Sequence, residues 1–257
     1  MTARSVALRA YRKTRDVLVP GLKHSQDMYE AELNRLVAPG MDWLDLGCGH
    51  HLLPLWRERQ EREMIARCRS VVGIDYDLPS LKKHRSMKLL VRGDISSLPF
   101  PDASFDLVTA NMVVEHLADP EPQFREIARV LRPGGHFIFH TPHAKGYLTR
   151  ITRLVPETLK GPLIRVLDGR ASEDVFPTHY LANTQDTVAP IAERAGLGVV
   201  KVRLVATQAV SSVVLPLAVV ELLWIRLLLA RPLRELRPNL IAVLAKPATA
   251  PSPAGSF

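Results

Sequence analysis

WLDLGCGHH, residues 43–51, is the stretch that decides the fold. An apolar run reaches Asp45 and passes almost directly into Gly47 and Gly49, which permit a tight turn and the close approach of a ligand to the backbone. A dinucleotide-binding fingerprint would read G-x-G-x-x-G, but position 52 is Leu. The stretch therefore predicts a strand that leads into a nucleotide-binding turn of another kind.

Apolar runs alternate with helical stretches on both sides of this turn. The predicted elements, in chain order, are a helix over 25–37, strands over 43–46, 70–74, 88–91, 105–110 and 136–141, a helix over 184–195, and strands over 198–205 and 239–245. Such alternation is typical of an α/β fold, in which a mostly parallel sheet is covered by helices on both faces.

The length of 257 residues and the apolar content of 47% suit a single domain over 1–245. Within it we expect an N-terminal helical cap over 1–40, two irregular insertions on the substrate side over 142–183 and 206–237, and after it a disordered tail over 246–257. The formal charge of +8 favours an acidic partner. Two cysteines and no apparent signal peptide predict a cytoplasmic protein.

Polar residues follow three further strands. Asp75 ends the second strand 26 positions after Gly49, close to the offset at which an acidic side chain accepts hydrogen bonds from ribose hydroxyls. Asp94 follows the third strand in GDISSLPF, and Asn111 ends the fourth. The constellation predicts a ligand with a ribose at this edge of the sheet.

These motifs, together with FDLVTANMVVEHL (105–117) and VLRPGGHFIFHTP (130–142), resemble those of class I S-adenosylmethionine-dependent methyltransferases. The resemblance covers about 25–141 and is closest to the small-molecule branch that includes the ubiquinone and menaquinone methyltransferases. It implies a three-layer Rossmann-like sandwich with a seven-stranded sheet whose last strand is antiparallel. It also implies S-adenosylmethionine as the cofactor and methyl transfer as the activity.

In the family, the glycine turn cradles the amino-acid portion of the cofactor, and the residue after the third strand faces the adenine amino group. The cofactor-binding residues that the resemblance implies are Asp45, Gly47, Cys48, Gly49, Asp75, Tyr76, Asp94, Ile95 and Asn111. One departure is His50-His51, because the family commonly carries a small residue near position 51.

Methyl transfer requires mainly alignment of the acceptor and exclusion of water, but a hydroxyl acceptor benefits from a general base, and His suits neutral pH. We expect His143 and His179 to be catalytic. Tyr29, His116 and Tyr180 are expected to contact substrate.

Glu115-His116 invites comparison with relatives that bind a divalent ion through Glu-x-x-Glu-His. The first position here is Met112, and a thioether is a poor ligand for a hard cation, so no metal site is predicted.

Residues 204–230 contain only two charged side chains, and arginines follow them. Pro216 and Glu221 interrupt the stretch and argue against a membrane span. Three interpretations stay open: a lid over an apolar substrate, a helix within 209–230 that lies in a membrane interface, and a core or dimer helix. The protein is accordingly expected in the cytoplasm, either free or attached to a membrane surface.

The favoured function is methyl transfer to a small apolar or lipid-linked acceptor, directed to oxygen. An RNA methyltransferase is an alternative that the basic charge supports, although residues 111–114 lack the Asn-Pro-Pro-aromatic signature of base-amino methylation. A cofactor-binding scaffold without turnover is a second alternative. The sequence predicts no oligomeric state.

Overall fold

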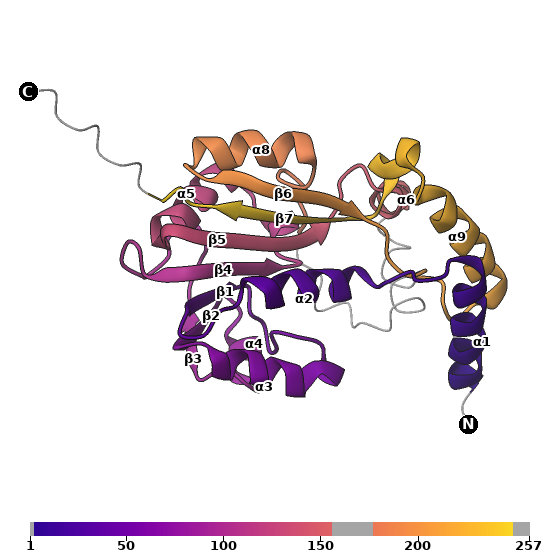
Figure 1. The fold of residues 1–257 in the computed structure, drawn as a ribbon, viewed down its shortest axis with the longest axis horizontal. Helices are drawn as coiled ribbons and strands as arrows, with labels where there is room; N and C mark the ends of the chain where they lie inside the picture. The colour runs from indigo at the N-terminus through magenta and orange to yellow at the C-terminus, as the bar shows by residue number, and fades with distance from the viewer. Residues whose placement is uncertain (1–2, 156–176, 249–257) are drawn as a thin grey trace, which may run out of the picture. The chain divides into compact units, whose positions relative to one another are not determined.

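The computed structural model describes residues 3–155 and 177–248. Within these residues seven strands form one sheet in the order β3-β2-β1-β4-β5-β7-β6 (Figure 1). The strands are β1 (Asp42–Leu46), β2 (Ser70–Asp75), β3 (Leu89–Arg92), β4 (Phe105–Asn111), β5 (Leu131–Pro142), β6 (Gly198–Val205) and β7 (Asn239–Ala245). β1 pairs in parallel with β2 and β4, β2 with β3, and β4 with β5. β7 runs opposite to its neighbours (Figure 1), so the predicted fold class is confirmed.

Helices pack on both faces of the sheet. The α-helices are α1 (Ala3–Leu18), α2 (Ser25–Leu36), α3 (Glu58–Arg67), α4 (Leu78–Lys82), α5 (Pro120–Val130), α6 (Tyr147–Leu154), α8 (Gln185–Arg194) and α9 (Leu215–Leu228). The short 3-10 helices are η1 (Leu55–Arg57), η2 (Val114–His116) and η4 (Arg231–Leu236). α8 begins at a capping box, because the Thr184 hydroxyl accepts the N–H of Thr187 at 3.1 Å.

The chain divides into two compact units. Unit 1 comprises residues 1–28, 142–178 and 204–240, and unit 2 comprises 29–141, 179–203 and 241–257. Unit 2 holds most of the sheet. Unit 1 contains α1, α6 and α9, which come from the expected cap and the two expected insertions. Parts of the first insertion (156–176) and of the expected tail (249–257) lie outside the described residues.

The core of unit 2 explains why the strands are so apolar. Every side chain of β1 is buried, and Trp43, Leu44, Leu107 and Phe137 have no exposed surface. A parallel sheet covered on both faces needs such continuous apolar strands instead of an alternating pattern.

Unit 1 has a core of its own. Tyr11 and Val19, from α1 and the turn after it, pack with Ala218, Leu222 and Ile225 of α9. The Tyr11 hydroxyl accepts the backbone N–H of Ala209 at 3.0 Å, so the polar tip of this buried ring is satisfied.

β5 is longer than predicted. The sequence places a turn at Pro133-Gly134-Gly135 and a strand from 136, but the strand begins at Leu131 and runs through that turn. Its register with β4 jumps between the pairs Phe105–Leu131 and Leu107–His136. Gly134 has a φ of +81°, so the segment forms a bulge within the strand and does not end it.

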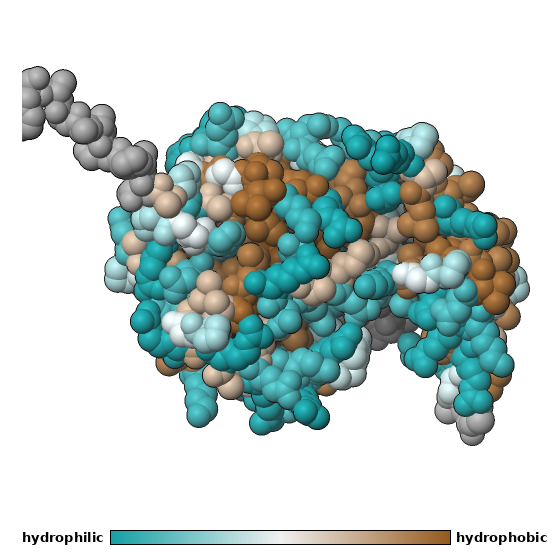
Figure 2. Space-filling model, viewed as in Figure 1, coloured by the Kyte–Doolittle hydropathy of each residue, from teal (hydrophilic) through white to brown (hydrophobic). Residues whose placement is uncertain are grey.

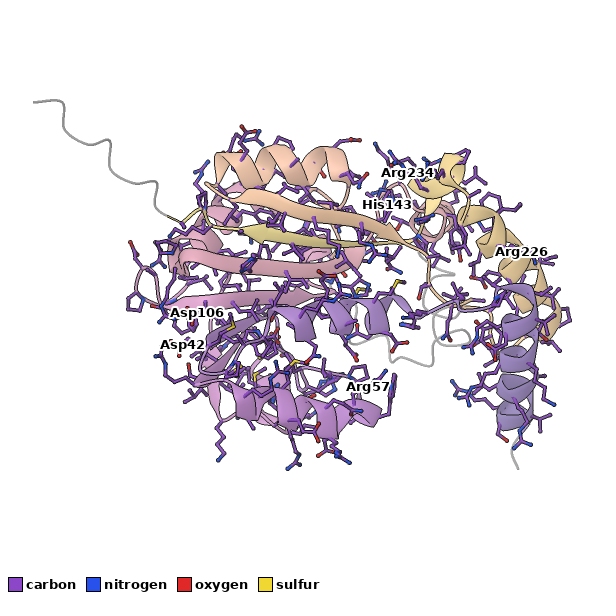
Figure 3. The ribbon with its side chains drawn as sticks, viewed as in Figure 1. Asp42, Arg57, Asp106, His143, Arg226 and Arg234 are labelled. Carbon is purple, nitrogen blue, oxygen red and sulfur yellow. The ribbon has the colours of Figure 1, made fainter. Side chains whose placement is uncertain are left out.

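The amino ends of the strands are closed by ion pairs. Arg132 bridges Asp106 at 2.6 Å and Asp42 at 2.8 Å (Figure 3), and Arg69 also pairs with Asp42. Hydrogen bonds from Arg69 and Arg132 hold the pKa of Asp42 well below its usual range. The carboxyl ends of the same strands lie at the opposite edge, where open α/β sheets bind ligands.

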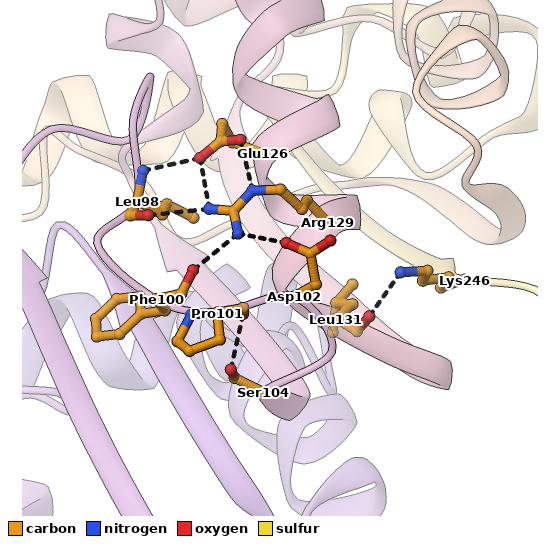
Figure 4. A network of polar contacts seen from close by, with 9 residues as sticks. All are labelled: Leu98, Phe100, Pro101, Asp102, Ser104, Glu126, Arg129, Leu131 and Lys246. Atoms are coloured by element: carbon orange, nitrogen blue, oxygen red, sulfur yellow. Dashed lines mark hydrogen bonds and ion pairs between the residues drawn. The ribbon is translucent and has the colours of Figure 1, made fainter.

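Arg129 of α5 holds the loop that follows β3 (Figure 4). Its guanidinium donates to the carbonyls of Leu98 at 2.9 Å and Phe100 at 2.8 Å, and it pairs with Asp102 and Glu126 at 2.8 Å each. The Glu126 carboxylate also accepts the N–H of Leu98 at 2.9 Å. One side chain thereby fixes the loop that carries Asp94.

Replacing Arg129 with Met is expected to destabilise the protein by about 2 kcal/mol, because two partly buried carbonyls and two carboxylates lose their donor. In thermal unfolding this corresponds to a Tm lower by about 6 °C for a chain of this length. The control is Arg125→Met, which removes an exposed pair with Glu121 on the same helix and should cost about 0.5 kcal/mol. Equal losses would contradict the role of Arg129.

Candidate cofactor site

The glycine turn joins β1 to the edge of β2. The N–H groups of Gly47 and Cys48 donate to the Ile74 carbonyl at 2.8 and 3.2 Å. Gly47 and Gly49 have φ values of +62° and +52°, which only glycine adopts without cost. A Cβ added to Gly47 would lie 2.5 Å from Cγ2 of Val113. Position 47 therefore requires glycine for two independent reasons.

Asp75 connects the turn to the end of β2. Its Oδ2 accepts the N–H of Gly49 at 2.9 Å, and its Oδ1 accepts the N–H of Asp77 at 2.8 Å. A carboxylate oxygen has a second lone pair, so both atoms keep acceptor capacity for hydroxyl groups of a ligand. The carboxylate is thus fixed in place by the backbone before any ligand arrives.

Asp45 is buried beneath the turn. Its Oδ1 accepts the hydroxyl of Thr109 at 2.5 Å. Burial raises the pKa of Asp45 to about 7, and the acidic neighbours Glu61 and Asp75 add to the shift. A cationic group of a ligand beside Asp45 would relieve this penalty.

Asp94 lies after β3 on an exposed loop. Its Oδ1 accepts both the N–H and the hydroxyl of Ser96 at 2.7 Å, and these bonds lower the pKa of Asp94. The edge therefore presents three carboxylates, from Asp45, Asp75 and Asp94. S-adenosylmethionine offers the matching donors, namely an ammonium, ribose hydroxyls and an adenine amino group, so the residues present fit this cofactor.

Asn111 ends β4 beside His140 of β5. Asn111 Oδ1 and His140 Nδ1 are 2.9 Å apart, and the His140 ring stacks on Tyr29 with 5.7 Å between ring centres. Tyr29 is 1% exposed. Its predicted contact with substrate stays a prediction, since the ring packs here against the sheet.

Glu115, in the turn after β4, organises the neighbouring residues. Its carboxylate is buried and accepts the hydroxyl of Thr141 at 2.7 Å, and Thr141 in turn accepts from the amide of Asn183 at 2.6 Å. Burial raises the pKa of Glu115. Its carbonyl accepts the N–H groups of His179 and Tyr180 at 2.7 and 3.2 Å. The segment predicted to contact substrate is thereby attached to the carboxyl edge of unit 2.

The histidines predicted to act on substrate fall into different units. His179 is exposed, and His116 Nε2 lies 3.9 Å from Glu115 Oε1, both within unit 2. His143 belongs to unit 1, where it has no exposed surface and its Nδ1 lies 3.0 Å from the Arg237 carbonyl. Burial lowers the pKa of His143. The roles of all three stay predictions.

His50 and His51 stack with 4.3 Å between their ring centres. His50 is exposed, whereas burial and the adjacent His50 lower the pKa of His51 to about 4, so His51 is neutral at pH 7. The buried Glu61 carboxylate accepts the N–H of Leu53 at 2.8 Å and pairs with Arg85. Glu61, which is not part of the sequence motif, therefore holds the segment that follows the glycine turn.

Sequence reasoning also missed Thr109, Thr141 and Asn183. Thr109 accepts the indole N–H of Trp43 at 2.8 Å while donating to Asp45. The sequence could have indicated Thr109, because it is a polar residue within the apolar run LVTA of β4. Thr141 and Asn183 pair across 42 positions, and no local pattern marks such a contact.

In the part of the chain that the structure describes, no group of three or more His, Cys, Asp or Glu side chains is arranged to hold a metal ion. Among the same residues, no helix has the length and apolar character that crossing a membrane requires.

The strand order, the antiparallel β7 and the acidic side chains near the carboxyl ends of β1, β2 and β3 fit a class I S-adenosylmethionine-dependent methyltransferase domain. Residues 44–139 match the methyltransferase domain family, so the chain contains such a domain, and its family and fold imply S-adenosylmethionine as the cofactor.

The chain is 36% identical over 134 residues to a probable S-adenosylmethionine-dependent methyltransferase of Mycolicibacterium smegmatis, covering 49% of each chain. It is 35% identical over 137 residues to a demethylmenaquinone methyltransferase of Corynebacterium kroppenstedtii, covering 49% of this chain and 57% of that protein. A malonyl-[acyl-carrier protein] O-methyltransferase of Serratia marcescens is 33% identical over 40% of this chain and 39% of its own. The chain thus spans about half the length of the first two relatives.

A solved methyltransferase structure from Mesorhizobium loti shares the fold, with a TM-score of 0.55 at 22% identity over 84% of this chain and 96% of its own. A [4+2]-cyclase, SpnF, is nearly as similar, with a TM-score of 0.54 at 16% identity over 87% of this chain and 81% of its own. These likenesses concern the fold alone, because one fold can serve different reactions.

The raised pKa of Asp45 predicts a pH dependence for cofactor binding. A ligand ammonium requires the ionised carboxylate, whereas below about pH 7 the ligand-free protein holds a proton there. Affinity for S-adenosylhomocysteine should therefore fall as pH falls, by roughly 30-fold between pH 8 and pH 5.5, since only the ionised fraction binds. Calorimetric titrations across this range measure it. Asp45→Asn should bind weakly at every pH, and an unchanged slope in that variant would assign the proton to another group.

Proposed function

We propose that the protein transfers a methyl group from S-adenosylmethionine to a hydroxyl of a small apolar or lipid-linked acceptor. The observation that carries the transfer itself is the set of three carboxylates at one edge of unit 2, Asp45, Asp75 and Asp94. They fit the three donor groups of this cofactor.

S-adenosylmethionine, when bound, supplies a methyl group activated by its sulfonium, so the protein's task is mainly to align and to exclude water. The Gly47–Gly49 turn allows close approach of the cofactor to the backbone, and Asp75 orients a ribose. His179, exposed beside Glu115, is the base we assign to the acceptor hydroxyl: its imidazole would take the hydroxyl proton as the oxygen attacks.

The names of two relatives support methyl transfer to oxygen and an apolar acceptor. The relatives include one named an O-methyltransferase and one named for demethylmenaquinone.

The test uses purified protein, methyl-labelled S-adenosylmethionine and a fractionated cell extract. We expect label in a small product that enters organic solvent, and a product whose new methyl group is bonded to oxygen. His179→Ala should lower kcat by about 100-fold with an unchanged affinity for S-adenosylhomocysteine. Label in RNA would favour a nucleic-acid methyltransferase, and tight cofactor binding without any label would favour a scaffold.

A further inference from the structure

The excess positive charge of the chain lies almost entirely in unit 1. Among the described residues, unit 1 has 13 Lys or Arg against 4 Asp or Glu, whereas unit 2 has 18 of each. The methyltransferase edge in unit 2 thus belongs to a neutral body. The positive charge of unit 1 favours a negatively charged partner for that unit.

Helix α9 of unit 1 is apolar on two faces. One face is buried in the core shared with α1, by Ala218, Leu222, Ile225 and Leu228. The other face is exposed: Leu217 is 51% accessible, Val220 64%, Leu223 48% and Leu227 55%. Figure 2 shows hydrophobic surface over α9, in addition to that over the sheet. Large exposed apolar faces mark interaction sites.

Glu221, the acidic residue of α9, forms hydrogen bonds inside unit 1 and is not part of the exposed apolar face. Glu221 accepts the Tyr147 hydroxyl at 2.8 Å, the N–H groups of Val210 and Ser211 at 3.1 and 3.0 Å, and the Ser211 hydroxyl at 2.5 Å. Its negative charge is therefore committed to holding the helix in unit 1, and it does not oppose an anionic partner at the exposed face.

Cations flank the exposed face. The ring of Tyr147 contacts Trp224 with 6.4 Å between centres, which places α6 beside α9. α6 exposes Ile151 between Arg150 and Arg153. η4, which packs on the end of α9, exposes Arg231 and also Arg234, which is labelled in Figure 3 and pairs with Glu235 at 3.3 Å. Apolar side chains with arginines at their border are the composition of helices that lie in a membrane interface.

We propose that unit 1 binds the surface of an anionic lipid bilayer, with the exposed face of α9 in the headgroup region and the arginines of α6 and η4 on lipid phosphates. Charge favours this occupant over a second copy of the chain, because an isologous contact would bring two strongly positive units together. The proposal concerns unit 1 and does not depend on methyl transfer.

The test is co-sedimentation of the 257-residue chain with vesicles of phosphatidylcholine alone and of phosphatidylcholine with phosphatidylglycerol. Binding is expected to the anionic vesicles and to decrease in high salt. Val220→Glu should weaken binding by about tenfold or more, because an exposed valine that would enter the headgroup region is replaced by a charge. Val200→Glu is the matched control: it makes the same change at a side chain 60% exposed in unit 2 and should bind as the unmodified protein does.

The double variant Arg231→Gln, Arg234→Gln should weaken binding by about 25-fold, at about fivefold for each cation near an anionic surface. Unchanged affinity for S-adenosylhomocysteine in both unit 1 variants would show that unit 2 is intact. The proposal is overturned if neither vesicle binds, if Val220→Glu and Val200→Glu bind equally, or if light scattering shows a dimer that Val220→Glu dissociates. Failure to find a methyl acceptor would leave these outcomes unaffected.

Discussion

Replacing Asp75 with Ala is expected to lower the affinity for S-adenosylhomocysteine by about 100-fold or more. The carboxylate holds the N–H groups of Gly49 and Asp77, and it is the acceptor we assign to the ribose hydroxyls. Hydrogen bonds to a charged group contribute about 1.5–3 kcal/mol each, so losing two ribose contacts accounts for the expected change. Isothermal titration calorimetry measures it.

Asp77→Ala is the control for this experiment. It removes the same charge two positions away and deletes the cap that accepts the N–H of Ser80 at 3.0 Å, which should cost about 1 kcal/mol of stability. Its affinity for S-adenosylhomocysteine should change by less than about threefold, since no ligand contact is lost. Unchanged affinity in Asp75→Ala would remove the ribose assignment.

Replacing Gly47 with Ala is expected to have the second-largest effect. The new Cβ would lie 2.5 Å from Cγ2 of Val113, and the φ of +62° is unfavourable for alanine. The turn must shift, so we expect a loss of stability of about 2 kcal/mol from strain and overpacking and a loss of cofactor affinity of about 100-fold from the displaced turn backbone. Thermal unfolding and calorimetry read out the two effects separately.

Two further variants isolate the contact from the dihedral angle. Gly196→Ala carries a comparable φ of +79° with nothing within 4 Å of the new Cβ, so it should cost about 1 kcal/mol and leave cofactor affinity unchanged. Adding Val113→Ala to Gly47→Ala should recover part of the affinity, because the two positions are coupled. No recovery would place the defect in the dihedral alone.

The strands of unit 2 could be predicted from sequence because each is a short apolar run between turn residues, as for Trp43 and its neighbours. The start of β5 could not be, since Pro133-Gly134-Gly135 has the composition of a turn and yet remains hydrogen-bonded within the sheet as a bulge. Local chemistry favours a turn there, but Leu131 and His136 on either side pair with β4, and Gly134 and Gly135 bond to the backbone of Lys246, so the strand continues.

The candidate site divides in the same way. The three carboxylates could be predicted from sequence because each lies near the carboxyl end of an apolar strand, namely Asp45, Asp75 and Asp94. The support of Asp45 by Thr109, and of Glu115 by Thr141 and Asn183, depends on contacts between segments 26–64 positions apart. Such pairs are set by the register of the strands, which no single stretch of sequence encodes.

The division into two units is likewise non-local. Three separate segments make up unit 1, so its core and its concentration of charge become visible only when α1 is placed against α9. His143 follows β5 directly in sequence, and its imidazole is buried against the carbonyl of Arg237, so its catalytic role stays a prediction.

A crystal structure of the 257-residue chain with S-adenosylhomocysteine tests the central claim most directly. We predict the ligand's ammonium near Asp45, its amino-acid portion over the Gly47–Gly49 turn, its ribose hydroxyls within hydrogen-bond distance of the Asp75 carboxylate, and its adenine beside Asp94 and Ile95. A ligand whose ribose lies away from Asp75, or that binds at another edge of the sheet, would contradict the account.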